Sequence, residues 1–284
     1  MNRQMNGTPD YEESFTLCLA RVDRASEIRE AMAEEWNAHL ESKPRGFRLV
    51  PAAPGQWDMQ IYALSPTPEK LSMLFGEWLY QLRAGLDGLA YQLAVRDSGE
   101  DPPPNPSGIY FPIFDSETKF TKNRPRLGAM NDGTVADLER IQPYHAEPSH
   151  LSNVLWWINE LARLDRHRRG HAVRAHIRKF RIGVHPPAQC QIVLSGKSSV
   201  EIDEGNGTVI ARVSAPANLT APEVQDLLVP DVENVPDIPE WLNRATAPID
   251  NSLLDFRMKY AEIWVMDAIT HFQKQTEERL SRQS

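Results

Sequence analysis

The sequence predicts an α+β fold: mainly a helical bundle, with an N-terminal β-hairpin and a β-meander inserted before the C-terminal helix. Long stretches with apolar residues at helical spacing predict the bundle, and alternating hydrophobicity in two places predicts the strands. The chain has 284 residues, 41% of them hydrophobic and 25% charged, which is typical of a globular protein. We expect one domain over residues 1–284, with a helical core from 11–42, 67–97, 148–170 and 251–282 and a β-rich insertion at 172–215.

The N-terminal part predicts a helix, a hairpin and a second helix. Residues 11–41 contain no proline or glycine, and their apolar side chains recur every three or four positions. The segments 47–50 and 59–63 alternate in hydrophobicity around a Pro-Gly pair, which predicts a short hairpin packed on helices. The next helix has the clearest apolar stripe, and Gly76 and Gly85 within it predict close approach of another element.

The rest of the chain alternates between irregular and periodic segments. Residues 98–133 are rich in Pro, Asn, Asp and Gly around one apolar hexapeptide at 109–114, which predicts a long connection over the core. A short helix follows at 134–141, and the helix predicted at 148–170 precedes about four alternating segments. Residues 216–248 hold six prolines and are predicted to run irregularly before the closing amphipathic helix.

Composition and missing motifs exclude several classes of function. The formal net charge is −8, so the surface as a whole repels nucleic acid and acidic membranes. The two cysteines do not form a CxxC pair, and there is no P-loop, GxGxxG, HExxH or GxSxG motif. The chain also lacks a membrane-spanning apolar run and an N-terminal signal core. We expect a cytoplasmic protein with no cofactor, no metal site and no membrane contact.

The strongest functional signal is a basic cluster near the end of the helix predicted at 148–170. Residues 163–181 hold eight of the 31 basic side chains, three of the eight histidines and one carboxylate. Arginine binds phosphate strongly, and histidine exchanges protons near neutral pH. One hypothesis is therefore a metal-independent ribonuclease or RNA-processing protein that binds RNA or a nucleotide. Its candidate catalytic residues are Arg166, His171 and His167, and its candidate phosphate-binding residues are Arg163, Arg168 and Arg169.

Non-catalytic interpretations account for the same residues. Cations are favoured at helix C-termini, so the cluster would cap the helix and pair with acidic neighbours. Alternatively, Arg83, Asp87 and Asp165 form a structural network that orients two core helices in a binding or interaction protein. Asp165 stands where the stripe predicts an apolar residue, and it needs a cation such as Arg83 or Arg168. A metal site at the two histidines is disfavoured, because four arginines within residues 163–171 repel a cation.

The two hypotheses predict different burial. A ribonuclease needs His171 and Arg166 open to a cleft, because both must reach the substrate. The network needs Asp165 and Arg168 closed against Arg83, because a buried carboxylate requires a partner.

Three short motifs resemble a widespread group of uncharacterised bacterial and phage proteins. The motifs are Arg83-x3-Asp87, Gln142-Pro143-Tyr144 and Asp165-Arg166-His167-Arg168. The resemblance spans residues 70–171 and implies no established activity. This chain departs from the group's pattern at Gly88, where the group often has His, and at Arg166, where it has Lys.

The Arg-x4-His spacing from Arg166 to His171 is similar, at greater distance, to the higher eukaryotic and prokaryotic nucleotide-binding (HEPN) helical bundles. Many of those proteins are dimeric, metal-independent ribonucleases whose Arg and His meet across the dimer. The resemblance implies that Arg166 and His171 are the catalytic pair and that the protein forms a homodimer.

Overall fold

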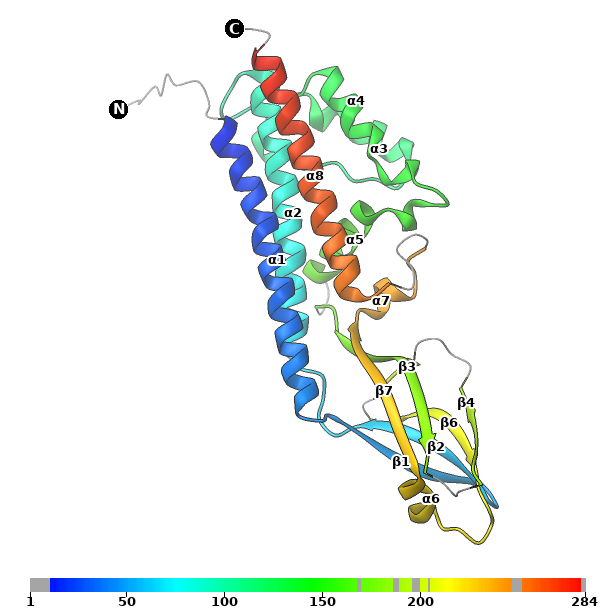
Figure 1. Ribbon diagram of the computed structural model, residues 1–284. Helices are drawn as coiled ribbons and strands as arrows, with labels where there is room; N and C mark the ends of the chain where they lie inside the picture. Colours follow the sequence, from blue (N-terminus) through cyan, green and yellow to red (C-terminus); the bar gives the residue numbers. More distant parts are fainter. Residues whose placement is uncertain are drawn as a thin grey trace. The chain divides into compact units, whose positions relative to one another are not determined.

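The computed structural model describes residues 11–167, 170–185, 189–195, 200–203, 205–246 and 252–281. These residues form long helices and antiparallel sheets, so the predicted α+β class is confirmed (Figure 1). The chain divides into two compact units, while the single domain stays a prediction. The helical unit comprises Met1–Met32, Met73–His171 and Glu240–Ser284, and the sheet unit comprises Ala33–Ser72 and Ala172–Pro239.

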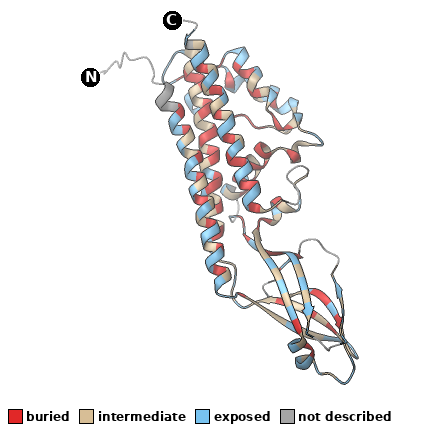
Figure 2. Cartoon of the chain, viewed as in Figure 1, coloured by how far each residue is buried: buried red, intermediate tan, exposed pale blue. Residues whose placement is uncertain are grey.

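Four helices form the core of the helical unit. They are α1 (Tyr11–Glu41), α2 (Glu69–Ser98), α5 (Val154–His167) and α8 (Leu254–Ser281), and the first two also have residues in the sheet unit. Their buried residues lie on the faces turned toward one another (Figure 2). The predicted helix at 148–170 begins later than expected, because the Asn153 side chain accepts the Leu155 N–H (2.8 Å) at the start of α5.

A buried carboxylate joins three of these helices. Glu262 of α8 is 5% exposed and accepts hydrogen bonds from Trp78 Nε1 (2.9 Å), Arg29 Nε (3.1 Å) and Ser26 Oγ (3.1 Å). Arg29 also forms an ion pair with Asp255 (2.9 Å). Because every donor comes from α1 or α2, these bonds fix how α8 lies against both helices.

The connection from α2 to α5 contains the short helix predicted at 134–141, which is α4, together with elements that the sequence did not predict. It contains the helices α3 (Glu117–Asn123) and α4 (Asp132–Arg140) and four 3₁₀ turns, η1 (Pro106–Gly108), η2 (Arg124–Leu127), η3 (Pro143–His145) and η4 (His150–Ser152). The predicted close approach at the glycines of α2 is present. A Cβ atom on Gly76 would lie 3.0 Å from Asp165 Oδ2, and one on Gly85 would lie 3.3 Å from the carbonyl oxygen of Cys18.

The sheet unit contains two antiparallel sheets. One has the order β1-β2-β6-β4 and the other has the order β5-β3-β7. The bounds are β1 (Arg45–Ala53), β2 (Gln56–Ala63), β3 (Arg174–Val184), β4 (Gln191–Leu194), β5 (Val200–Glu201), β6 (Thr208–Ser214) and β7 (Leu228–Asp237). The predicted hairpin is β1–β2. It was expected to pack on helices, but its second strand pairs with β6 in a larger sheet.

Strand pairing differs from the predicted meander. The four strands between residues 172 and 215 are all present, but β3 and β4 belong to different sheets, as do β5 and β6. The segment predicted to be irregular contains α6 (Ala221–Leu227), the strand β7 and α7 (Pro239–Leu242). The strands predicted before the C-terminal helix are thus present, but β3 makes its long pairing with this later strand.

Candidate functional site

The motif residues of α2 bind the backbone of the connection that crosses the helical core. Arg83 Nη2 donates to Asp87 Oδ1 and to the carbonyl oxygen of Phe111, each at 2.9 Å. The N–H of Phe111 in turn donates to Asp87 Oδ1 at 2.9 Å. An i,i+4 ion pair on one helix therefore satisfies both backbone polar groups of a fully buried phenylalanine.

Gln142, which follows this segment in the sequence, also binds its backbone. This residue is 1% exposed, and its Nε2 donates to the carbonyl oxygens of Pro112 and Leu138, both at 2.9 Å. Its Oε1 accepts the N–H of Phe114 at 2.9 Å. We call Arg83, Asp87 and Gln142 the clamp, because together they hold residues 111–114 by the backbone.

The clamp was only partly visible in the sequence. The sequence predicts Arg83 and Asp87 within one structural network, whereas it contains Gln142 only as part of the Gln-Pro-Tyr motif. The available signal was an isolated apolar hexapeptide within a polar connection, which needs partners for its buried peptide groups.

The buried guanidinium of Arg83 has a lowered pKa. Burial lowers the pKa of Arg83, and nearby Asp87 opposes that shift while the charge of Arg166 adds to it. The Nη1 atom of Arg83 is buried and has no hydrogen-bond partner in the described part of the chain. A guanidinium stays charged in proteins, so this nitrogen keeps a positive charge close to a second cation.

Asp165 does not complete the predicted network with Arg83. Its half-buried carboxylate lies against Gly76 of α2, and a Cβ atom on Gly170 would lie 3.3 Å from its Oδ1. Between described residues, no ion pair joins Asp165 to Arg83. Arg168, the other cation that was expected beside it, lies outside the described residues, as does Arg169.

His171 is enclosed in the helical unit. It is 4% exposed, and its Nε2 lies 2.8 Å from the carbonyl oxygen of Leu161, so this nitrogen must carry the proton that it donates. The ring stands nearly perpendicular to that of Phe75, with 5.6 Å between centroids, and Nδ1 lies 3.9 Å from Glu240 Oε2. His171 is therefore enclosed by close contacts, whereas a catalytic histidine would need to be open to a cleft.

The other predicted residues of α5 lie at its surface or outside the description. Arg166 is exposed, and its Nε donates to the carbonyl oxygen of Ala162 (3.2 Å). Arg163 is exposed and makes a two-pronged pair with Glu160 (2.9 Å for both bonds). No contact joins Arg166 to His171 among the described residues, and the side chain of His167 is not described.

The remaining basic residues of the cluster belong to β3 in the sheet unit, where acidic residues of β7 face them. In the register of this pair, Arg174 lies opposite Asp237, Lys179 opposite Glu233, and Arg181 opposite Asp231. Glu233 also lies 3.6 Å from Arg178, and 3.9 Å separates it from Lys179. Much of the local positive charge is thus compensated by a strand that the sequence did not predict.

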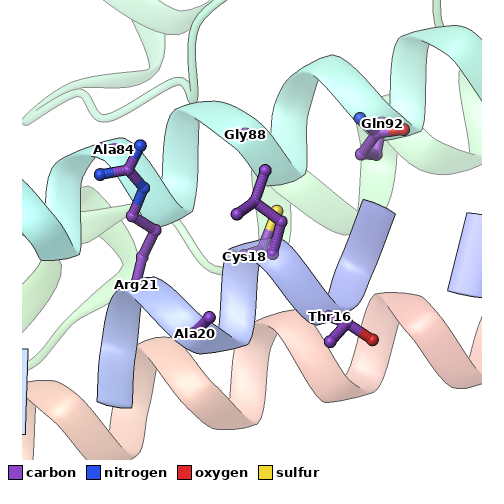
Figure 3. A pocket seen from close by; sticks show the side chains of 8 residues that line it. Thr16, Cys18, Ala20, Arg21, Ala84, Gly88 and Gln92 are labelled. Carbon is purple, nitrogen blue, oxygen red and sulfur yellow. The ribbon is translucent and has the colours of Figure 1, made fainter. Parts of the chain in front are cut away.

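A groove of about 580 Å³ lies between α1 and α2 in the helical unit (Figure 3). Cys18 faces it beside Gly88, where a Cβ atom would lie 3.0 Å from the cysteine Sγ. A larger side chain at position 88, such as histidine, would require the Cys18 side chain to move. Burial raises the pKa of Cys18 to about 11, with Arg21 opposing the shift, so the thiol is protonated at neutral pH. The groove therefore offers no activated nucleophile.

Comparison of the chain with protein-family models, curated proteins and solved structures found no significant match. The resemblances of the short motifs therefore stay predictions. None of the helices in the described ranges is long and apolar enough to cross a membrane. Nor do the described residues place three or more His, Cys, Asp or Glu side chains where they could hold a metal ion.

Proposed function

We propose that the protein is a non-catalytic interaction protein, in which the motif residues stabilise the helical unit and do not cleave RNA. The observation that carries this proposal is the clamp. Arg83, Asp87 and Gln142 direct their hydrogen bonds at peptide groups of residues 111–114. A catalytic group must instead reach the atoms of a substrate.

The burial of His171 also supports this proposal. Its protonated ring nitrogen is bonded to a carbonyl oxygen of its own chain, and its other nitrogen faces Glu240 beside Phe75. A general base or acid needs a ring nitrogen within hydrogen-bond reach of the substrate. His171 therefore acts as a buried histidine that ties the chain after α5 back to the helix.

Cleavage of a labelled RNA pool in EDTA tests the proposal. The wild type, Arg166→Ala and Arg163→Ala are compared, because both arginines are exposed on α5. We expect no cleavage above the buffer control by any of the three proteins. Cleavage that survives chelation, and that disappears in Arg166→Ala while circular dichroism shows a native fold, would establish the ribonuclease instead.

A second candidate function is non-catalytic binding of a phosphate group from RNA or a nucleotide. The observation that favours it is the buried Nη1 of Arg83, which has no hydrogen-bond partner among the described residues, together with the exposed Arg166 nearby, whose one hydrogen bond within the described ranges goes to a carbonyl oxygen. Two guanidinium groups without a shared carboxylate attract an anion. Inorganic phosphate should then raise the melting temperature of the wild type but not that of Arg166→Gln. An equal shift in both proteins would exclude this site.

A further inference from the structure

One face of α8 carries apolar side chains that lie in water. Phe256 is 63% exposed, Ile263 is 41% exposed, and Tyr260 and Met266 are each 39% exposed. They follow one another in steps of four, three and three residues, so they form one stripe along the helix. A solvated helix face normally carries polar residues, and a contiguous apolar stripe marks an interaction surface.

The charges beside this stripe are arranged symmetrically about Ile263. Lys259 stands four residues before it and Asp267 four residues after it, and both are exposed. Neither forms an ion pair with any described residue. They are eight residues apart, which corresponds to about 12 Å along the helix, so they are too distant to pair with each other.

A second copy of the chain matches this pattern. If two α8 helices lie antiparallel about a two-fold axis at Ile263, then Lys259 of each copy lies opposite Asp267 of the other. The same arrangement places Tyr260 opposite Met266 of the second copy and brings the two Ile263 side chains together. One symmetry operation therefore covers the apolar stripe and pairs both charges, as an isologous interface requires.

We propose that the exposed face of α8 is a homodimer interface between two copies of this chain. The inference rests on the proposed role as an interaction protein and names its partner. Its test is the mass of the particle, whereas the proposed function is tested by RNA cleavage, so either can fail without the other.

Sedimentation of the full chain from 1 to 200 µM measures the association. Because each copy contributes few apolar side chains, we expect a weak dimer with a Kd on the order of 10 µM. Ile263→Glu should raise the Kd at least tenfold. Met73→Glu is the matched control, because Met73 is a 67% exposed apolar residue on α2 and should leave the Kd unchanged.

A charge exchange tests the antiparallel arrangement itself. Lys259→Asp and Asp267→Lys should each weaken the dimer about tenfold, and the double variant should recover most of the loss because the opposed charges are restored. A monomer at every concentration, a dimer indifferent to Ile263→Glu, or a double variant weaker than both single variants would overturn the proposal. Circular dichroism of each variant separates these results from misfolding.

Discussion

Replacing Gln142 with leucine tests the clamp, because the two side chains are similar in size and the change removes only hydrogen bonds. In the wild type, Gln142 donates to the carbonyl oxygens of Pro112 and Leu138 and accepts the N–H of Phe114. The variant leaves these three peptide groups without this partner at a position that is 1% exposed.

The expected cost follows from the burial of the three groups. Pro112 and Leu138 are buried, whereas Phe114 is half-buried. A buried polar group left unpaired costs about 1–3 kcal/mol, and the greater apolarity of leucine returns a part of that cost. We therefore expect the free energy of unfolding to fall by about 2–4 kcal/mol.

Urea denaturation followed by circular dichroism at 222 nm measures this change. Gln92→Leu is the matched control, because Gln92 lies on α2 at the groove and makes no hydrogen bond to the described residues. That control should change the free energy by less than about 0.5 kcal/mol. An equally small effect for Gln142→Leu would refute the claim that the side chain of Gln142 holds the connection.

Three further predictions concern other buried groups. Glu262→Gln should lower the free energy of unfolding by about 2–3 kcal/mol, because it weakens a buried ion pair with Arg29. Urea denaturation measures this change, and a smaller loss of stability than that of the surface control Asp23→Asn would contradict the prediction. Cys190 is half-buried and should react with a thiol reagent at pH 8 well before Cys18, whose pKa is raised to about 11; equal rates would contradict the burial of Cys18. Burial and Glu139 raise the pKa of Tyr144 to about 12. The stability that Tyr144 adds should therefore be complete below pH 10 and lost as the pH rises from 10 to 12. The difference in phenolate absorbance between the wild type and Tyr144→Phe measures the midpoint of the Tyr144 titration.

The helices could be predicted because their burial follows a regular spacing, but the strand β7 could not. Pro230 and Pro236 lie within β7, and proline argues against a strand because it lacks an N–H. The structure resolves this conflict by placing β7 at the edge of its sheet, where β3 is its one strand partner among the described residues. Edge strands tolerate proline, because one side of the strand needs no hydrogen-bonding partner.

The candidate site was less predictable than the fold. Gly76 indicated a close neighbour, and the structure shows that this neighbour is Asp165. The burial of His171 had no local signal, because it depends on how the chain turns back to Leu161 after the end of α5. The apolar hexapeptide at 109–114 indicates that its peptide groups are buried and need partners, but every residue has peptide groups, so the sequence does not indicate which side chains bind them.

The pairing of β3 with β7 changes how the sheet unit acts at a distance. Four basic side chains of β3 lie beside three acidic side chains of β7, so the two strands form a row of short dipoles instead of a line of net positive charge. The field of a dipole falls with distance faster than that of a single charge, and salt screens it further. The four basic side chains of β3 therefore contribute little to steering a polyanion over a distance, and a ligand would interact with them mainly on contact.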